Sequence, residues 1–429
     1  MTYTDAVSRV LALRGGEHAG MRPGLDRIHA LLAALGHPER RYHLVQVGGT
    51  NGKGSVSAML AAMLKAAGRR TGLYTSPHLV SFRERIRVNG DPISEDSVAD
   101  GVEALATLAA RLDTSMFEAT TALAFDHFAR EEVEVAVLEV GLGGRLDATT
   151  VGTPLVTILT QVDLDHQAVL GPTLADIARE KAAIVRGGLA LSAAQAPEVA
   201  AVVEDHAVRA GVPLLFAGRE LHVQVNHAHL DGQRICCEGP GWALPDLDLA
   251  LLGTFQPGNA LLAVAAARHL NLPEAAIRAG LTRVQWPGRF QVIGVRPRLV
   301  LDGAHNVAGA RALAASLRSY FSGQSTTLIV GLSADKDVAG ILAELAPLAD
   351  HLIATAASNP RAVAPTALVA GLPAHRPHAD TAPSVVAALA LAAQRPTSVT
   401  VVTGSLYLVA DALEHLFGDR PLRVERAAR

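Results

Sequence analysis

The feature that most constrains this chain is a glycine-rich turn, Gly48-Gly49-Thr50-Asn51-Gly52-Lys53-Gly54-Ser55, which follows an aliphatic run at 43–47. A segment with helical spacing, from Ser55 to about Ala67, comes directly after it. The order strand, glycine turn, helix is the context of a phosphate-binding loop, in which backbone N–H groups, the helix N-terminus and a lysine stabilise phosphate oxygens. A tight turn with a solvated lysine is the simpler interpretation. The spacing also departs from the common triphosphatase pattern, because Gly54 separates Lys53 from Ser55.

Short apolar runs alternate with longer helical segments between about 42 and 160, which predicts an α/β fold with a mostly parallel sheet. Strands are predicted at 43–47, 71–74, 135–140 and 155–159. Ligands gather at the carboxyl ends of such strands. Polar residues follow several of these ends, and we expect them to share one crevice: Thr50, Asn51, Lys53, Ser76, Glu139 and His166.

The second half of the chain changes its pattern. Alternating stretches at 221–230 and 234–237 predict an antiparallel patch, and a helix is predicted at 259–269. Proline and glycine then interrupt both periodicities at Gln285-Trp286-Pro287-Gly288-Arg289-Phe290. A new α/β alternation follows, with strands predicted at 299–301, 327–330, 351–355 and 399–402. We therefore predict one domain at 1–285, a linker at 286–290 and a smaller α/β domain at 291–429.

Composition excludes several classes of protein. The chain has 429 residues, 49% of them hydrophobic, which is ample for buried cores and unlike a disordered protein. A net charge of −3 leaves no basic excess for general nucleic-acid binding. No apolar run approaches the roughly 20 residues of a membrane span, and the polar start is unlike a secretory signal, so a cytoplasmic protein is expected. Cys236 and Cys237 are neighbours in an alternating stretch, which predicts opposite faces and no disulfide or zinc site.

The phosphate-loop sequence resembles that of the folylpolyglutamate synthase and dihydrofolate synthase family, relatives of the Mur ligases. The resemblance runs through nearly the whole chain. Its other motifs, in family order, are Tyr74-Thr75-Ser76-Pro77-His78-Leu79, Phe117-Glu118-Ala119-Thr120-Thr121, the run 138–149, Asp165-His166, Glu180-Lys181, Asp302-Gly303-Ala304-His305-Asn306, Asp335-Lys336-Asp337 and Gly404-Ser405-Leu406-Tyr407-Leu408.

This resemblance implies an N-terminal Mur-ligase-like P-loop ATPase domain with a mostly parallel sheet and a smaller, Rossmann-like C-terminal glutamate-ligase domain. It implies an ATP-dependent ligase that joins L-glutamate to folates, and to dihydropteroate as well, through an acyl phosphate. A monofunctional folylpolyglutamate synthase is the alternative. The implied partners are small molecules only, namely ATP, L-glutamate and a folate or dihydropteroate, and the implied state is a monomer without membrane or nucleic-acid contacts.

The resemblance also implies a metal site. It places Mg²⁺, with two ions expected, at Ser76, Glu139, His166 and Lys181, and it implies that Lys181 is carbamylated and that a monovalent cation such as K⁺ is used. The expected catalytic residues are Lys53, Glu139, His166 and Lys181. A turn hydroxyl, a loop imidazole and an exposed lysine are the simpler interpretations of Ser76, His166 and Lys181. Glu139 differs, because a carboxylate that ends an aliphatic run is costly to bury without a cation or a donor.

Nucleotide and substrate positions follow from the same resemblance. The nucleotide is assigned to Gly49, Thr50, Asn51, Gly52, Lys53, Gly54, Ser55, Gln256, Asn259, Arg289, Asp302 and His305. Phe117, Asp147 and Ala148 are assigned to the pterin, since an aromatic ring can stack on a flat heterocycle and a carboxylate can accept from its amino groups. Ser405 and Tyr407 are assigned to glutamate. Phe117 in the core, Arg289 in a linker ion pair and Asp302 in a strand-ending turn are the structural alternatives.

Two other functions fit parts of the pattern. A Mur-type amino-acid ligase of cell-wall synthesis would carry an extra domain ahead of the phosphate loop, and here that loop begins at Gly49. A nucleotide-binding regulator without catalysis is the second alternative. The retained Lys53, Glu139, His166 and Lys181 argue against it, because a protein that only binds nucleotide needs no second metal site.

Overall fold

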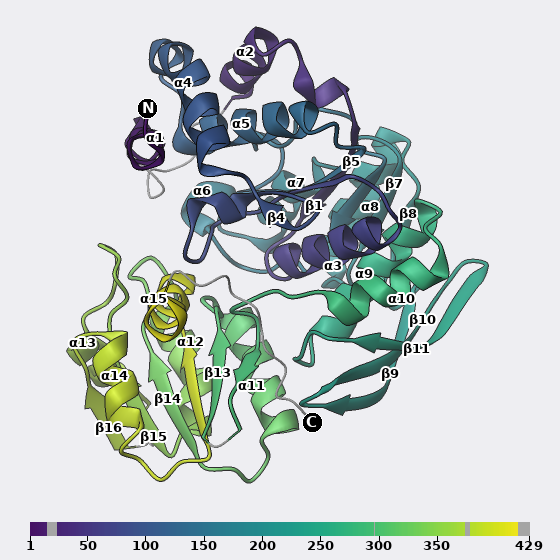
Figure 1. Ribbon diagram of the computed structural model, residues 1–429. Coiled ribbons are helices and arrows are strands. Elements are labelled where there is room, and N and C mark those ends of the chain that lie inside the picture. Colours follow the sequence, from purple (N-terminus) through teal and green to yellow (C-terminus); the bar gives the residue numbers. More distant parts are fainter. Residues whose placement is uncertain (15–23, 296, 374–377, 419–429) are drawn as a thin grey trace. The chain divides into compact units, whose positions relative to one another are not determined.

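The computed structural model describes residues 1–14, 24–295, 297–373 and 378–418, and Figure 1 shows its elements. The chain forms two compact units. Unit 1 comprises Met1–Val223, Cys237–Leu247 and Gly258–Arg283, and unit 2 comprises Gln224–Cys236, Asp248–Pro257 and Val284–Arg429. The domain boundaries predicted around 286–290 stay a prediction, and 419–429 of the second predicted domain lie outside the described residues.

An eight-stranded sheet forms the centre of unit 1, in the order β4-β3-β2-β5-β1-β6-β7-β8. Its strands are β1 His43–Gly48, β2 Thr71–Tyr74, β3 Ile86–Val88, β4 Asp91–Pro92, β5 Val135–Glu139, β6 Val156–Leu159, β7 Leu189–Ser192 and β8 Leu214–Phe216. All neighbours from β2 to β8 are parallel, whereas β3 pairs antiparallel with both β2 and β4. The predicted parallel sheet is confirmed, and its four predicted strands end within a residue of the observed ones.

Helices cover both faces of this sheet. They are α1 Tyr3–Leu11, α2 Asp26–Ala34, α3 Lys53–Ala66, α4 Glu95–Leu112, α5 Met116–Arg130, α6 Gln167–Leu170, α7 Leu174–Ala182, α8 Pro197–Ala210, α9 Gln256–His269 and α10 Glu274–Arg283, with short 3₁₀ turns η2 Pro38–Arg40 and η3 Phe82–Arg85. One apolar cluster joins α1, α2, α4 and α5 to β5, and another joins α7 and α8 to β6 and β7. Helix α10 packs directly on α3, where a Cβ at Gly280 would lie 2.6 Å from the backbone of Met63.

A separate three-stranded sheet has the order β11-β10-β9, with β9 His222–His229, β10 Gly232–Gly239 and β11 Trp242–Leu249. Two-residue connections require antiparallel neighbours, so the predicted antiparallel patch is confirmed, while β11 was not predicted. Cys237 is buried, Cys236 is partly exposed, and both are free thiols, as their neighbouring positions on one strand predict.

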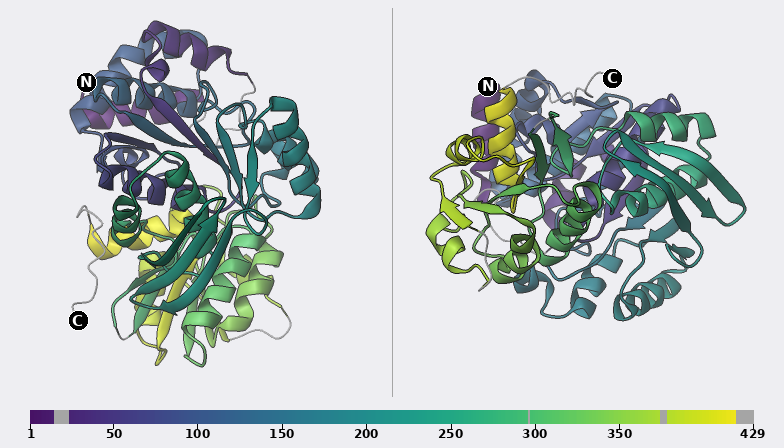
Figure 2. Two further views of the ribbon diagram at one scale, coloured as in Figure 1. Left: turned by 90° about the vertical axis from the view of Figure 1, so that its right-hand side faces the viewer. Right: turned by 90° about the horizontal axis from the view of Figure 1, so that it is seen from below.

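Unit 2 contains a six-stranded sheet in the order β12-β13-β17-β14-β15-β16. Its strands are β12 Gln291–Ile293, β13 Arg298–Asp302, β14 Thr326–Val330, β15 His351–Ala354, β16 His378–Thr381 and β17 Val399–Thr403, and only β12 is antiparallel. Its helices are α11 Val307–Tyr320, α12 Val338–Leu345, η4 Ala346–Leu348, α13 Pro365–Ala370, α14 Val385–Ala392 and α15 Leu406–Phe417. Figure 2 gives two further views of these layers. The second α/β alternation predicted from the sequence is confirmed. Within the described residues, no helix combines the length and the apolarity that a membrane span requires.

Candidate active site

The glycine-rich turn links the end of β1 to the start of α3. Gly49 has φ +133°, and a Cβ there would lie 2.0 Å from Oγ1 of Thr160. Gly52 has φ +95°, and a Cβ there would lie 2.5 Å from Oδ1 of Asn259 on α9. A side chain at either position would therefore be strained and would clash. The helix begins at Lys53, two residues earlier than predicted, so Lys53 itself belongs to the first helical turn.

Hydrogen bonds tie this turn to the segment that follows β6. The amides of Thr50 and Asn51 donate to the carbonyl of Gln161, at 2.8 and 3.4 Å. Oγ1 of Thr50 also donates to the carbonyl of Asp163 at 3.1 Å and accepts from its amide at 3.0 Å. The amides of Thr50 and Asn51 thus fix the glycine-rich turn to the segment after β6. The first-turn amides of α3, which have no acceptor within the helix, are the groups that suit a phosphate.

Two lysines meet at the carbonyl of Gly49. Nζ of Lys53 lies 3.2 Å from it and 3.0 Å from the carbonyl of Thr50, and Nζ of Lys181 on α7 lies 2.8 Å from the Gly49 carbonyl. Lys181 is only 4% exposed, so its interpretation as an exposed lysine is wrong. Burial, and then the charge of Lys53, lowers the pKa of Lys181 to about 7. A substantial fraction of this amine is therefore neutral near pH 7.

Three of the expected metal positions lie at or after the ends of β2, β5 and β6, which belong to the same sheet. Glu139 closes β5, is 6% exposed, and accepts from the backbone amide of Ser76, at the end of β2, at 3.2 Å. His166 follows β6 in the left-handed region, with φ 53°, and its amide donates to Oδ1 of Asp165 at 2.8 Å. Asp165 is also buried, and its charge raises the pKa of Lys181 against the larger effect of burial.

The donor set fits magnesium. No three His, Cys, Asp or Glu side chains in the described part of the chain form a ready metal cluster. Mg²⁺ seldom needs one, because it usually takes one or two carboxylates and completes its shell with water and phosphate. The buried carboxylate of Glu139, next to Ser76 and at the same sheet edge as the phosphate loop, provides hard oxygen ligands of this kind.

Asp147 shapes the loop after β5. Its Oδ2 accepts from the amides of Gly141 and Leu142, at 3.0 and 2.9 Å. Its Oδ1 accepts from the amide and the hydroxyl of Thr149, at 2.9 and 2.5 Å. Burial raises the pKa of Asp147. The structure therefore gives this carboxylate a local role in holding the loop, and its contact with a pterin stays a prediction.

Phe117 lies against the same loop. A Cβ at Gly141 would lie 2.5 Å from Cζ of the Phe117 ring, and the Phe117 and Tyr74 ring centroids are 6.0 Å apart. Phe117 is partly buried against the apolar cluster of α5, to which Ala148 also belongs. Thr150, the next residue but one after Ala148, accepts from Nε2 of the buried Gln46 at 2.7 Å. The loop that carries the predicted pterin residues is thus fixed to β1.

The predicted residues of unit 2 are held by their sequence neighbours. Asp302 ends β13, is 4% exposed, and accepts from the amides of Phe290 and Ala304, at 2.7 and 2.9 Å. Burial raises the pKa of Asp302, and the charge of Arg289 opposes this. Arg289 lies so close that a Cβ at Gly303 would be 2.5 Å from its Nη1. Asp302 therefore closes a strand-ending turn beside a cation.

The remaining predictions fall on helix starts and on a turn. Gln256 is fully buried at the start of α9, and Nδ1 of His305 lies 2.8 Å from the carbonyl of Gly303. Ser405 is the N-cap of α15, because its hydroxyl accepts from the amide of Tyr407 at 3.1 Å. These positions are local caps and turns as well as predicted ligand contacts.

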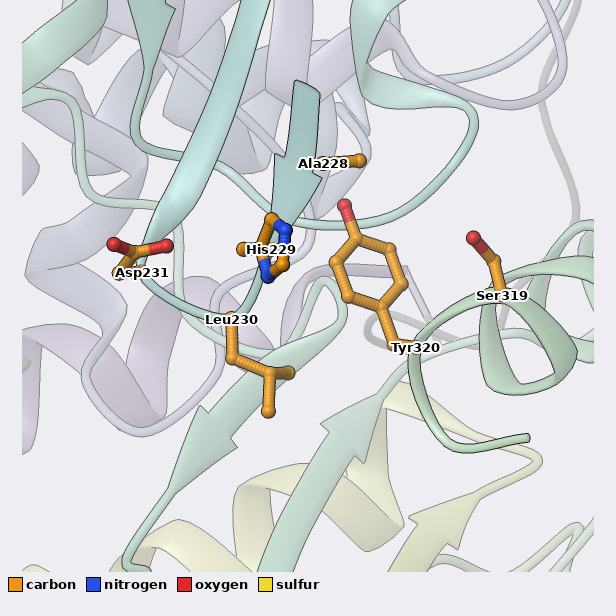
Figure 3. Close-up of a pocket in the computed structure, with 6 residues that line it drawn as sticks. All are labelled: Ala228, His229, Leu230, Asp231, Ser319 and Tyr320. Atoms are coloured by element: carbon orange, nitrogen blue, oxygen red, sulfur yellow. The ribbon is translucent and has the colours of Figure 1, made fainter. Parts of the chain in front are cut away.

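One cavity of unit 2 contains none of these residues. It measures about 510 Å³ and lies at the turn between β9 and β10 and the end of α11. Figure 3 shows its lining residues, Ala228, His229, Leu230, Asp231, Ser319 and Tyr320.

Sequence reasoning missed Asp165 as a member of the site. The pair Asp165-His166 was noted as a motif, but only the histidine was assigned a role. The available signal was that Asp165 directly precedes His166, a predicted metal ligand. Its burial next to Lys181 depends on the packing of α7, which no local pattern shows.

Comparison with known protein families identifies two domains in this chain. Residues 47–267 match the Mur ligase middle domain, and residues 288–406 match the Mur ligase glutamate ligase domain. Folylpolyglutamate synthase from Lacticaseibacillus casei is 35% identical, over 98% of this chain and 100% of its own length. The dihydrofolate synthase/folylpolyglutamate synthase of Escherichia coli K12 is 34% identical, over 91% of this chain and 90% of its own.

Solved structures agree. Mycobacterium tuberculosis folylpolyglutamate synthase, complexed with ADP and AMPPCP, has a TM-score of 0.89 at 36% identity and covers 98% of this chain and 100% of its own. Escherichia coli FolC, in complex with DHPP and ADP, has a TM-score of 0.89 at 31% identity and covers 98% of this chain and 99% of its own. The chain therefore belongs to the folylpolyglutamate synthase and dihydrofolate synthase family of the Mur ligases, a family of ATP-dependent ligases.

Proposed function

We propose that this protein joins L-glutamate to the carboxylate of a folate in an ATP-dependent reaction, and that it also accepts dihydropteroate. The observation that carries this proposal is the meeting of Lys53 and Lys181 at the carbonyl of Gly49, within the phosphate loop. The cation of Lys53 on this loop suits a site where negative charge gathers on phosphate oxygens, and the partly neutral Lys181 beside it is the residue that we propose is carbamylated. The named activities of the relatives supply the substrate class.

In the proposed reaction, the acceptor carboxylate attacks the γ-phosphate of ATP and gives an acyl phosphate and ADP. The amine of glutamate then attacks the acyl carbon, and inorganic phosphate leaves the tetrahedral intermediate. Such transfers depend mostly on positioning and charge stabilisation. We assign Gly49 to Ser55 and Asn259 to the nucleotide, with Lys53 exchanging the carbonyls of Gly49 and Thr50 for phosphate oxygens.

We assign Mg²⁺, with two ions, to Ser76, Glu139, His166 and Lys181. Bound magnesium would neutralise phosphate charge and orient the phosphoryl group. The contact of Ser76 with the buried Glu139 supports this assignment. A monovalent cation such as K⁺ and a monomeric state are further expectations from the family, and a cytoplasmic location is the expectation from the sequence pattern.

Carbamylation of Lys181 is part of this proposal. Its pKa of about 7 provides a neutral amine that can attack CO₂, forming an N–C bond and releasing one proton. The product is an anionic carbamate, which suits a metal ion and the neighbouring charge of Lys53. Mass spectrometry under native conditions, with and without bicarbonate, tests for the added CO₂.

Substrate positions complete the proposal. We assign Phe117, Asp147 and Ala148 to the pterin and Ser405 and Tyr407 to glutamate. The E. coli relative in complex with DHPP and ADP supports a small-molecule acceptor. In unit 2 we assign Gln256, Arg289, Asp302 and His305 to the nucleotide, and the charge of Arg289, which opposes the raised pKa of the buried Asp302, supports a polar site there. The proposed domains are 1–285 for ATP and 291–429 for glutamate ligation, joined by 286–290.

The experiment that tests the function is ADP release by the purified protein with Mg-ATP and L-glutamate. Dihydropteroate and a reduced folate are compared as acceptors. Turnover with both establishes a bifunctional enzyme, and turnover with the reduced folate alone establishes a folylpolyglutamate synthase. Nucleotide binding without acceptor-dependent ADP release would instead support the regulatory alternative.

A further inference from the structure

Gln195 lies outside every motif noted in the sequence, yet its side chain touches the segment that supports the phosphate loop. It follows β7, the neighbour of β6 in the sheet. Its Oε1 accepts from the amide of Val162 at 3.0 Å, and its Nε2 donates to the carbonyl of Thr160 at 3.0 Å. Gln195 thus bridges the backbone on both sides of Gln161.

Gln161 is the residue that the phosphate loop uses as its anchor. Its carbonyl accepts from the amides of Thr50 and Asn51, at 2.8 and 3.4 Å. Thr160 adds a second connection on the same side, because its amide and its Oγ1 donate to the carbonyl of Gly48, at 2.8 and 3.1 Å. The segment from Thr160 to Val162 therefore lies between the Gln195 side chain and the phosphate loop.

The two backbone groups make opposite demands on the side chain. The Val162 amide needs an acceptor and the Thr160 carbonyl needs a donor, so only a carboxamide of suitable length satisfies both. A carboxylate would keep the first contact and place negative charge against the Thr160 carbonyl. A third contact, from Nε2 to Oγ of Ser192 at 3.2 Å, involves no part of this segment.

We propose that Gln195 is a positioning residue for nucleotide binding, which holds Gln161, and through it Thr50 and Asn51, in the geometry that accepts the ATP phosphates. This inference rests on the proposed ATP-dependent function and extends it to a residue that follows β7. The same segment continues to Asp163, which exchanges hydrogen bonds with Oγ1 of Thr50. Loss of the bridge should therefore disturb the phosphate loop specifically.

The test compares Gln195→Met, which keeps the side-chain length and removes all its hydrogen bonds, with Gln195→Glu. Ser192→Ala is the matched control, because it removes only the contact that bypasses Thr160–Val162. We expect both Gln195 variants to weaken ADP binding, measured by calorimetry, and to lower kcat/KM for ATP by about tenfold or more, since small displacements of positioned groups cost this much. The KM for glutamate should stay within about twofold in all variants, and Ser192→Ala should resemble wild type.

Two outcomes would overturn this role. In one, Gln195→Met lowers the unfolding temperature but keeps wild-type ADP affinity, which would make Gln195 a purely structural residue. In the other, Gln195→Glu restores full affinity, which would show that the bond to the Thr160 carbonyl is dispensable. ADP affinity can be measured without turnover. A wild-type protein that binds ADP but shows no acceptor-dependent turnover would refute the proposed ligase function. The ADP affinities of the variants would still test the role of Gln195. If Gln195→Met does not fold, Gln195→Glu carries the same measurement.

Discussion

The two units hold their predicted site residues in different ways. In unit 1, the contacts of the phosphate loop join residues that are far apart in the sequence. Oγ1 of Thr50 bonds to Asp163, 113 positions away, and Nζ of Lys181 bonds to Gly49, 132 positions away. The phosphate loop is therefore shaped by several loops that meet at one edge of the sheet.

In unit 2, the contacts are shorter in sequence. Asp302 accepts from Ala304 and Ser405 accepts from Tyr407, each two positions away, and Asp302 also accepts from Phe290, 12 positions away. These are a strand-ending turn and a helix cap, which form whenever the local backbone forms. The difference suggests that changes in unit 1 disturb function broadly, whereas changes in unit 2 appear first as local losses of stability.

The largest expected effect is that of Lys53→Met. It removes the cation of the phosphate loop, and we expect kcat/KM for ATP to fall by about 10⁴-fold, the size of effect that cationic groups have on phosphoryl transfer. Lys65→Met is the control, because Lys65 is exposed near the end of the same helix. Steady-state ADP release measures both. If the two variants had equal activities, Lys53 would not belong to the active site, and the contrast between the two units would fail.

Glu139→Gln should have the next largest effect. The amide keeps the shape of a side chain that is 6% exposed, and it removes the charge proposed to hold magnesium. We expect kcat to fall by about 10³-fold and the Mg²⁺ concentration for half-maximal activity to rise. Glu132→Gln, at an exposed position just before β5, should leave both unchanged. An unaltered Mg²⁺ dependence in Glu139→Gln would mean that Glu139 only fixes the amide of Ser76.

The same contrast explains what the sequence could predict. Strand periodicity located the parallel strands β1, β2, β5, β6, β13, β14, β15 and β17 to within a residue, because buried strands consist of continuous aliphatic runs. The glycine turn was equally clear, since Gly49 and Gly52 have backbone angles that other residues avoid. The start of α3 at Lys53 was missed, because two of its first residues, Lys53 and Gly54, resemble a turn.

Long-range contacts were beyond sequence reasoning. Lys181 lies on a helix with charged neighbours, a pattern typical of solvent exposure, and only the packing of α7 against the phosphate loop buries it. Gln195 carries no motif at all. The short strands β3, β4 and β12 were also missed, because two or three residues show no period. The parallel strands β7, β8 and β16 were missed as well.

Lys181 also provides a test by pH. A lysine in the unfolded chain has a pKa near 10.5, and burial lowers that of folded Lys181 to about 7. Between pH 7 and 10.5 the unfolded chain binds more protons than the folded chain, so the free energy of unfolding rises with pH. The destabilisation caused by burying Lys181 is complete below pH 7 and is relieved as pH rises toward 10.5. Relative to Lys181→Met, wild type should therefore gain up to about 3 kcal/mol in free energy of unfolding between pH 7 and about pH 9.5.

Urea titrations in CO₂-free buffer measure this difference. Lys65→Met is again the control, because an exposed lysine should show no such dependence. Lys53→Met should reduce the effect, since the charge of Lys53 contributes to the lowered pKa of Lys181. A difference in free energy of unfolding between wild type and Lys181→Met that stays constant at all pH values would show that the ammonium of Lys181 is stabilised despite its burial. The electrostatic coupling between Lys53 and Lys181 in unit 1 would then be refuted.

The smallest expected effect belongs to unit 2. Ser405→Ala removes the hydroxyl that caps α15, and we expect a loss of about 1 kcal/mol in free energy of unfolding. Ser405→Asp keeps a capping oxygen and should restore that stability. If Ser405 also lines the glutamate site, as proposed, both variants should raise the KM for glutamate, whereas a residue that only caps the helix should leave this KM unchanged in the aspartate variant. Urea unfolding and glutamate-dependent ADP release on the same two proteins therefore separate the local contact from the functional one.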